Sequence, residues 1–402
     1  MIVTVTLNPA LDLTYAVDAL VPHGTHRVST VAERPGGKGL NVARVLHSLG
    51  EPVLATGLLG GTTGGRVAAL LRTEGVASSF VDIAGETRRT VAVVDGADAT
   101  GFWEPGPAIT EAEWSRFADH FRSLLREASV ITLSGSLPPG LPASAYATLI
   151  AYAREAGVPA LLDTSGPALR HGLLATPALA KPNADELASL RPPPTSRDRA
   201  DAPAYGAELA GAERAGAERA GAERAGAERA GAERAGAERA GAERAGAERA
   251  GAERAGAERA GAERAGAERA GAERAGAGFA DLVELVRAVA SGPVVVSRGA
   301  AGLLAIAEDE VWECVPPVAL DGNPTGAGDA CVAALARGLR DRTAWPELLA
   351  DAVALSAAAV ATPEAGAFNH DVYRQTFATA TPLPHRVGPA EISGGSRART
   401  HR

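Results

Sequence analysis

The chain has 402 residues, of which 46% are hydrophobic, enough for a sizeable core in one large domain or two ordinary ones. Its formal net charge of −8 argues against nucleic acid as a partner, because binding a phosphate backbone needs a basic surface. We see no apolar run of about 18 residues and no basic leader with a cleavage site, so we expect neither a membrane span nor a signal peptide.

The cysteine and lysine contents are both low. Cys314 and Cys331 fit no zinc or disulfide spacing, which predicts reduced thiols in a cytoplasmic protein. Among 40 Lys and Arg residues, only Lys38 and Lys181 are lysines. A lysine presents a compact ammonium where arginine presents a wide planar fork. The two lysines are therefore candidates for positions that Arg cannot fill, although both could also be chance survivors.

Strand-like and helix-like segments alternate along the chain, which predicts a mostly parallel sheet with helices on both faces. Helical periodicity ends at Gly50 and Gly75, a Thr110–Glu113 capping box begins another helix, a further helix starts near Ala143, and three helices follow from Ala327. The predicted strands are Ile2–Leu7, Val53–Leu59, Val130–Leu133, Pro159–Asp163, Pro293–Ser297 and Leu303–Ala307.

Two segments break this alternation. Residues 11–17 and 87–103 have hairpin-like patterns with no helix between their strands, which predicts a small separate sheet acting as a lid over a site. Between Gly211 and Ala275 the pentapeptide Gly-Ala-Glu-Arg-Ala repeats 13 times, with no net charge. We expect one folded α/β domain from residues 1–190 and 279–381, a low-complexity insertion at 191–278, and a disordered tail at 382–402.

The most informative motif is a Gly-rich loop that opens into a predicted helix, Asn323-Pro-Thr-Gly-Ala-Gly-Asp329. Backbone N–H groups at a helix start point outward, and the helix dipole favours anions there. Gly326 and Gly328 let the backbone approach a ligand without a Cβ clash. Asp329 could then accept a hydroxyl proton while the amides hold a phosphoryl group. The same string also fits a capped helix after an ordinary turn.

A second Gly-rich segment, Pro35-Gly-Gly-Lys-Gly-Leu-Asn-Val-Ala43, places Lys38 and Asn41 at another helix start. The lysine can neutralise a phosphate, and the asparagine can bond sugar hydroxyls. Asn8-Pro-Ala-Leu-Asp12 follows the first strand, at the edge where open α/β sheets bind ligands. Taken alone, Asp12 is also consistent with a turn carboxylate.

Three more segments carry suitable polar groups. Ser134-Gly-Ser-Leu-Pro-Pro-Gly140 offers two hydroxyls for a phosphate, or is equally an ordinary loop. Lys181-Pro-Asn-Ala-Asp-Glu186 has oxygen atoms, on Asn183 and Glu186, that suit a hydrated Mg²⁺. The strand and Gly turn at 294–302 suit the rim of a nucleotide site.

Together, the motifs that begin at Asn8, Gly36, Ser134, Lys181 and Gly326 resemble those of the phosphofructokinase-B family of the ribokinase superfamily, and most of all its 1-phosphofructokinase and tagatose-6-phosphate kinase branch. The resemblance implies a Rossmann-like three-layer α/β/α fold of ribokinase type with a small β-sheet lid. It also implies a kinase that uses ATP and Mg²⁺ to phosphorylate a sugar phosphate, and a homodimer formed through the lid.

The same resemblance implies roles for individual residues. Asp329 would be the catalytic base, beside an anion hole formed by Gly326, Ala327 and Gly328. The residues expected to bind the sugar phosphate are Asp12, Gly37, Lys38, Asn41, Arg88 and Ser134 or Ser136. Those expected to bind ATP are Lys181, Asn183, Glu186, Ser297, Gly299, Gly302 and Thr325, with Asn183 and Glu186 holding Mg²⁺ through water.

The sequence departs from the family pattern in the lid and near the nucleotide. Thr87-Arg-Arg-Thr90 ends in Thr where the family has Asn, Gly101 replaces a Glu, and Arg298 replaces a Leu. We expect fructose 1-phosphate as substrate, giving fructose 1,6-bisphosphate, with tagatose 6-phosphate or fructose 6-phosphate as alternatives. A kinase for an unphosphorylated sugar, and a catalytically weak sugar-phosphate sensor or scaffold, are the other hypotheses.

Overall fold

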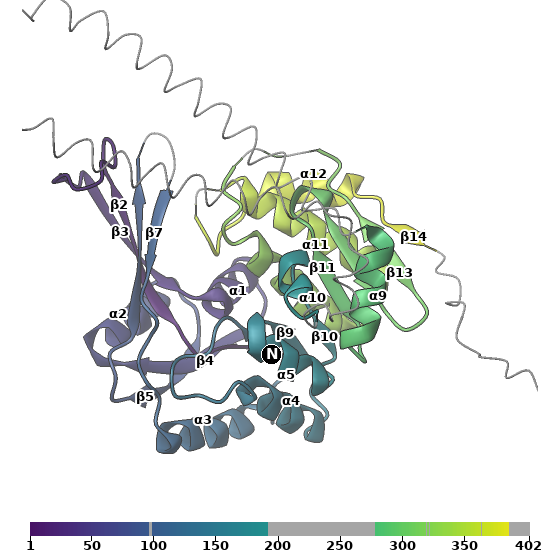
Figure 1. Ribbon diagram of the computed structural model, residues 1–402, viewed down its shortest axis with the longest axis horizontal. Helices are drawn as coiled ribbons and strands as arrows, with labels where there is room; N and C mark the ends of the chain where they lie inside the picture. The colour runs from purple at the N-terminus through teal and green to yellow at the C-terminus, as the bar shows by residue number, and fades with distance from the viewer. Residues whose placement is uncertain (96–98, 192–277, 319, 321, 363, 386–402) are drawn as a thin grey trace, which may run out of the picture. The chain divides into compact units, whose positions relative to one another are not determined.

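The computed structural model describes residues 1–95, 99–191, 278–318, 320, 322–362 and 364–385. The pentapeptide repeat and everything after residue 385 lie outside these ranges, so the expectations for them stay predictions. The described residues up to Leu190 and from Gly278 onward form one compact unit. Figure 1 shows this unit with many of its helices and strands labelled.

The larger of two sheets has the order β14-β13-β12-β11-β10-β9-β8-β1-β4-β5 among the described residues. From β5 to β11 all neighbouring strands run parallel, as the alternation of strands and helices predicted, while β12, β13 and β14 add antiparallel at one edge. The strands are β1 (Ile2–Thr6), β4 (Val53–Gly60), β5 (Ser78–Ile83), β8 (Val130–Ser134), β9 (Ala160–Asp163), β10 (Leu179–Ala180), β11 (Val294–Ser297), β12 (Leu303–Ile306), β13 (Val311–Cys314) and β14 (Leu383–His385).

Every residue of the central strands β1, β8 and β9 is buried, which requires helices on both faces of the sheet. One helix group packs in the series α1, α10, α11 and α12, and another in the series α3, α4, α5 and α9. The Thr110–Glu113 capping box predicted for α3 is present. The helices are α1 (Lys38–Ser48), α2 (Gly61–Thr73), α3 (Glu111–Leu124), α4 (Ala145–Glu155), α5 (Gly166–Leu174), α6 (Ala184–Ala188), α9 (Phe279–Val289), α10 (Ala327–Asp341), α11 (Trp345–Val360) and α12 (His370–Thr379), with a 3₁₀ turn η1 (Gly299–Ala301).

The second sheet has four strands among the described residues, in the order β3-β2-β6-β7. They are β2 (Ala10–Ala16), β3 (Thr30–Gly36), β6 (Arg88–Val94) and β7 (Ala99–Trp103). We call this sheet the lid. It contains both segments predicted for a small separate sheet. Strand β3 was not predicted, because it is an edge strand with exposed charged residues and a proline rather than an alternating apolar pattern.

Helix α1 begins directly after β3 and lies close against β1. A Cβ on Gly39 would be 2.4 Å from Thr6 Oγ1 and 2.8 Å from the carbonyl oxygen of Val5, so only glycine allows this approach. The contact fixes the first turn of α1, and with it Lys38 and Asn41, at the carboxyl end of β1.

The prediction of a disordered tail from residue 382 is wrong for Leu383–His385. These residues form β14, which pairs antiparallel with β13 at the edge of the large sheet. His385 also contacts Glu313 (Nε2 to Oε2, 3.0 Å) and packs on the ring of Phe279. A Pro-rich segment can add to a sheet edge because only one side of the strand needs hydrogen bonds.

Two further expectations concern the membrane and the thiols. None of the helices that the structure describes is long and apolar enough to cross a membrane. Cys314 and Cys331 are both buried and unpaired, as the sequence predicted.

Candidate active site

The polar motifs meet at the carboxyl ends of the parallel strands, where open α/β sheets bind ligands. Asn8 follows β1, Ser134 ends β8, Asp163 ends β9, Lys181 follows β10 and Ser297 ends β11. The N-terminal turns of α1 and α10 add their own polar residues at this edge.

Asp329 lies in the first turn of α10 and is only 7% exposed. Its Oδ2 atom accepts a hydrogen bond from Asn41 Nδ2 on α1 (2.8 Å). Asn41 therefore contacts the predicted base, in addition to any contact with the sugar hydroxyls expected from the sequence. Burial, and secondly the negative charge of Asp163, raises the pKa of Asp329 to about 7. A carboxylate with such a pKa is suited to take a proton near neutral pH.

The residues predicted to form the anion hole lie at the start of α10, and one of their N–H groups is already bonded. Gly326 adopts a left-handed conformation (φ 90°), and a Cβ there would lie 2.9 Å from the Cα of Ala365. The N–H of Ala327 is already bonded to the carbonyl oxygen of Pro324 (3.2 Å), so this group is not a free donor. Within the described residues, the N–H groups of Gly328 and Asp329 have no such partner and remain available to an anion.

The residue that sequence reasoning missed is Asp163, which is 1% exposed at the end of β9. Its Oδ1 lies 3.1 Å from Lys181 Nζ, and its Oδ2 lies 3.5 Å from Lys38 Nζ. One buried carboxylate thus contacts both lysines of the chain. A carboxylate as the last residue of a buried parallel strand was the available signal, because charges are almost never fully buried unless they are paired.

Charge pairing fixes the protonation states of this cluster. Burial alone would favour neutral Asp163, but the ammonium groups of Lys181 and Lys38 outweigh it and lower the pKa of Asp163. Burial likewise opposes a charged Lys181, yet the Asp163 carboxylate raises the pKa of Lys181 above its usual value. Asp163 and Lys181 are therefore both charged at neutral pH. Lys38 brings a second basic side chain to the cavity, where it lies 3.5 Å from Asp163 Oδ2 and 3.9 Å from Glu186 Oε1.

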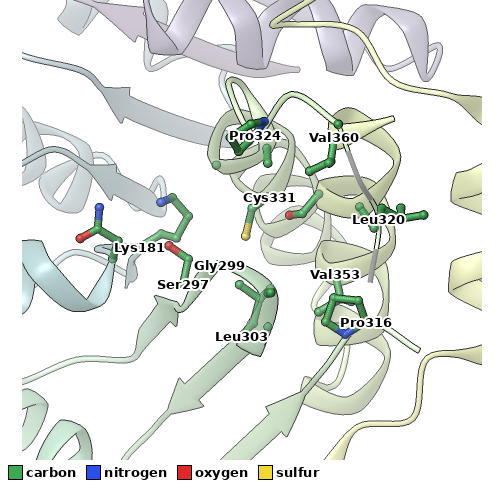
Figure 2. Close-up of a pocket in the computed structure, with 18 of the residues that line it drawn as sticks. Lys181, Ser297, Gly299, Leu303, Pro316, Leu320, Pro324, Cys331, Val353 and Val360 are labelled. Carbon is green, nitrogen blue, oxygen red and sulfur yellow. The ribbon is translucent and has the colours of Figure 1, made fainter. Parts of the chain in front are cut away.

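A cavity of about 510 Å³ opens beside this cluster. Figure 2 shows Lys181 and Ser297 at one side of it and Pro316, Leu320 and Val353 at the other. The sequence-predicted residues that line it are Lys38, Lys181, Asn183, Glu186, Ser297, Gly299, Gly302, Ala327 and Gly328. A polar, cationic end and an apolar end fit the phosphates and the base of a nucleotide, and the volume is typical of ligand sites.

Asn183 and Glu186, the predicted metal-binding pair, form a capping box at the start of α6. Asn183 Oδ1 accepts from the Glu186 N–H (2.7 Å), and Glu186 Oε2 accepts from the Asn183 N–H (2.8 Å). The other carboxylate oxygen, Oε1, lies 3.9 Å from Lys38 Nζ in the cavity lining. One acidic oxygen is thus left to face a hydrated cation, which fits Mg²⁺ held through water.

The lid contributes Asp12 and Arg88. Arg88 donates from Nε to the carbonyl oxygen of Asn8 (3.1 Å) and from Nη1 to that of Glu104 (3.2 Å). Gly37 has a φ of 111°, and a Cβ there would meet Thr6 Cγ2 at 2.9 Å, so the residue is suited to glycine alone. Burial, the largest influence, raises the pKa of Asp12.

Three other predicted residues have distinct positions. Ser134 is completely buried within the end of β8, so the prediction that its hydroxyl meets a substrate phosphate is not supported by this structure. Ser136 is exposed, and its hydroxyl oxygen accepts from Asn8 Nδ2 (3.2 Å), which makes it the better candidate. Thr325 is exposed beside the cavity but does not line it, and its N–H bonds Asn323 Oδ1 (3.0 Å).

A buried carboxylate beside free helix-start amides and paired lysines has the parts of a phosphoryl-transfer site. A family model described as "pfkB family carbohydrate kinase" matches residues 5–215 and 268–371. The chain therefore belongs to the pfkB family, and it is a sugar kinase, a phosphotransferase with ATP as phosphate donor.

Solved structures agree with this assignment. Phosphofructokinase-2 from Escherichia coli, in complex with potassium, has 25% identity and a TM-score of 0.68, over 94% of this chain and 98% of its own. A possible 1-phosphofructokinase from Thermotoga maritima has 22% identity and a TM-score of 0.67, over 96% and 100%. A putative phosphofructokinase from Staphylococcus aureus has 21% identity and a TM-score of 0.65, over 96% and 99%. The ribokinase-type α/β fold expected from the sequence is confirmed.

The Asp163 cluster generates a stability prediction. Asp163→Asn should reduce the free energy of unfolding by about 3–5 kcal/mol, because it leaves the Lys181 ammonium buried without a counter-charge. Adding Lys181→Met to that variant should recover part of the loss, since the stranded charge is then removed. Urea denaturation measures each value.

Glu33→Gln serves as the control, because the Glu33–Arg66 pair is well exposed and should contribute less than about 1 kcal/mol. Lys181→Met alone is measured as well. If the loss of unfolding free energy in the double variant equals the sum of the losses in the two single variants, the predicted coupling is contradicted.

Proposed function

We propose that this sugar kinase phosphorylates a hydroxyl of a sugar phosphate, and that its preferred substrate is fructose 1-phosphate, which gives fructose 1,6-bisphosphate and ADP. Tagatose 6-phosphate and fructose 6-phosphate are the alternatives. The observation that carries the proposal is the first turn of α1, which connects three groups. Gly36, just before it, contacts Asp12; Asn41 bonds Asp329; and Lys38 pairs with Asp163 beside the nucleotide cavity.

In the proposed reaction Asp329 takes the proton of the acceptor hydroxyl. That oxygen forms a bond to the γ-phosphorus of ATP while the bond from phosphorus to the β–γ bridging oxygen breaks, and ADP leaves. The N–H groups of Gly328 and Asp329 and the α10 dipole stabilise the negative charge on the moving phosphoryl group. Lys38 adds a mobile positive charge, because its side chain is 41% exposed at the cavity while Lys181 is fixed by burial.

For the nucleotide we propose that Lys181, Ser297, Gly299 and Gly302 line the ATP site and that Thr325 lies at its margin. Magnesium, when bound through Asn183 and Glu186, would supply charge neutralisation for the β- and γ-phosphates.

For the sugar phosphate we propose that Asp12, Gly37 and Asn41 bind the hydroxyls. Arg88 and Ser136 bind the phosphate that the substrate already carries. Both contact Asn8. Arg88 donates to the backbone carbonyl oxygen of Asn8, and the Ser136 hydroxyl oxygen accepts from the Asn8 side-chain amide. A structure of Escherichia coli phosphofructokinase-2, 25% identical over 94% of this chain, is a complex with fructose-6-phosphate, which keeps that sugar among the candidates.

ADP release by purified protein with Mg-ATP should be measured with fructose 1-phosphate, fructose 6-phosphate and tagatose 6-phosphate. We expect fructose 1-phosphate to give the highest kcat/KM. Asp329→Asn should lower kcat at least about 100-fold, because the general base is lost, while sugar-phosphate binding is retained.

Equal ADP release by the wild type and Asp329→Asn would contradict the role of Asp329. Binding of a sugar phosphate without turnover in the wild type would instead favour the sensor hypothesis.

We also propose that the lid forms a homodimer interface. Strand β7 is an edge of the lid, and all five of its residues are exposed. Phe102 and Trp103 are 58% and 77% exposed, on opposite faces of the strand, which is unusual for aromatic side chains without a partner. A second copy would cover both the edge and the aromatic rings. One structure of Escherichia coli phosphofructokinase-2 is tetrameric.

Sedimentation velocity tests this proposal. The wild type should sediment as a dimer, and the double variant Phe102→Ser/Trp103→Ser should shift to monomer because it removes the exposed aromatic surface. Phe377→Ser is a matched control, since Phe377 is also exposed (39%) but lies on α12. A monomeric wild type, or a dimer in all three proteins, would contradict an interface at β7.

A further inference from the structure

Thr90 and Asp12 are direct neighbours across two parallel strands of the lid. Strand register pairs Asp12 on β2 with Thr90 on β6 and with Arg34 on β3, so the three side chains share one face of the sheet. The Thr90 hydroxyl donates a hydrogen bond to Asp12 Oδ1.

The cationic neighbours of Asp12 are engaged elsewhere. Arg34 pairs with Glu364, Arg88 donates to the carbonyl oxygens of Asn8 and Glu104, and Arg44 bonds Glu74 (2.6 Å). Within the described residues, Thr90 is the only hydrogen-bond partner of the Asp12 side chain.

The carboxylate is also confined sterically. A Cβ on Gly36 would lie 2.1 Å from Asp12 Cγ, so the carboxylate occupies the space that a larger residue would fill. One oxygen of Asp12 is thus fixed by Thr90, and the second, Oδ2, has no donor among the residues that the structure describes.

We propose that Thr90 is a positioning residue that orients the Asp12 carboxylate toward the sugar and thereby sets the selectivity among sugar phosphates. This inference rests on the proposed function, in which Asp12 accepts hydrogen bonds from sugar hydroxyls. Threonine has one donor, and that donor is used by Asp12. An asparagine carboxamide has two N–H donors and an acceptor, so it could bond a sugar hydroxyl as well. With Thr90 present, Asp12 Oδ2 is the only atom of this pair left to accept a hydrogen bond from the sugar.

The chemical consequence concerns the class of substrate. A carboxylate only accepts hydrogen bonds, so it selects a sugar that presents a hydroxyl donor at this point. A sugar whose hydroxyl is absent or inverted there leaves Asp12 unpaired, which is costly for a partly buried carboxylate. Selection by a single fixed acceptor should therefore discriminate between sugar phosphates that differ at one carbon.

Thr90→Val keeps the side-chain shape and removes the donor. We expect it to raise the KM for the preferred sugar phosphate about tenfold, the typical effect of losing a hydrogen bond to a charged group, with the KM for ATP unchanged. Thr90→Ser should restore the wild-type value because it keeps the hydroxyl. Thr90→Asn should change the ratio of kcat/KM between two sugar phosphates. Thr14→Val is the control, since Thr14 lies two residues along the same face of β2 with Ala32 and Ala92 as strand neighbours.

The pH dependence distinguishes positioning from a merely structural effect. The Thr90 hydrogen bond lowers the pKa of Asp12, as do the charges of Arg88 and Arg44. Removing the bond raises that pKa, so Asp12 is protonated at higher pH. The KM of Thr90→Val should consequently begin to rise at higher pH than that of the wild type as the solution is acidified.

Sugar-phosphate binding by calorimetry separates the two proposals. If the wild type turns over a sugar phosphate and Thr90→Val matches it in KM, pH profile and selectivity, the inference about Thr90 is overturned while the proposed function stands. If the wild type neither binds nor phosphorylates any of the three sugar phosphates, both the proposed function and this inference are wrong.

Discussion

The structure of the site depends on one buried carboxylate. Asp163 is almost inaccessible, yet it remains ionised because Lys181 and Lys38 approach it from two sides. Without Asp163 the ammonium of Lys181, itself 3% exposed, could not be buried at the edge of the sheet. The same negative charge acts on Asp329 and helps to hold the pKa of that residue near neutrality. A single ion-pair cluster thus brings both lysines to the cavity and influences the pKa of Asp329, the proposed base.

Close backbone packing brings the remaining groups to this cluster. Asn41 and Asp329 are 288 residues apart in the chain, yet they are hydrogen-bonded because α1 and α10 both begin at the carboxyl edge of the sheet. Gly39 allows α1 to touch β1, and Gly326 allows α10 to begin beside Ala365. In each case a Cβ would collide with neighbouring atoms, so packing requires glycine at both positions.

The sequence predicted the parallel core well, because its strands are short apolar runs between clear helix signals. Both Gly-rich helix starts, the capping box of α3 and the small sheet were also predictable from local patterns. Strands β5, β10 and β13 of the large sheet were not predicted, and β10 has only two residues. Strands β3 and β14 were also missed, since an exposed edge strand carries no apolar alternation. Asp163 was missed because its role comes from two lysines at distant positions. Ser134 and Ser136 looked equivalent in the motif, and only burial separates them.

Asp329 is the proposed base, and its pKa depends on its buried neighbours. The pH profile of kcat/KM tests this most directly, because it reports the ionisation of the free enzyme. Wild-type kcat/KM should fall as the pH drops below about 7. Asp163→Asn removes a charge that raises the pKa of Asp329, so the acidic fall in kcat/KM should move to lower pH. Asn41→Ala removes a hydrogen bond that lowers the pKa of Asp329, so the acidic fall in kcat/KM should move to higher pH. If kcat/KM falls at the same pH in the wild type and in both folded variants, the assignment of Asp329 as the titrating base is contradicted.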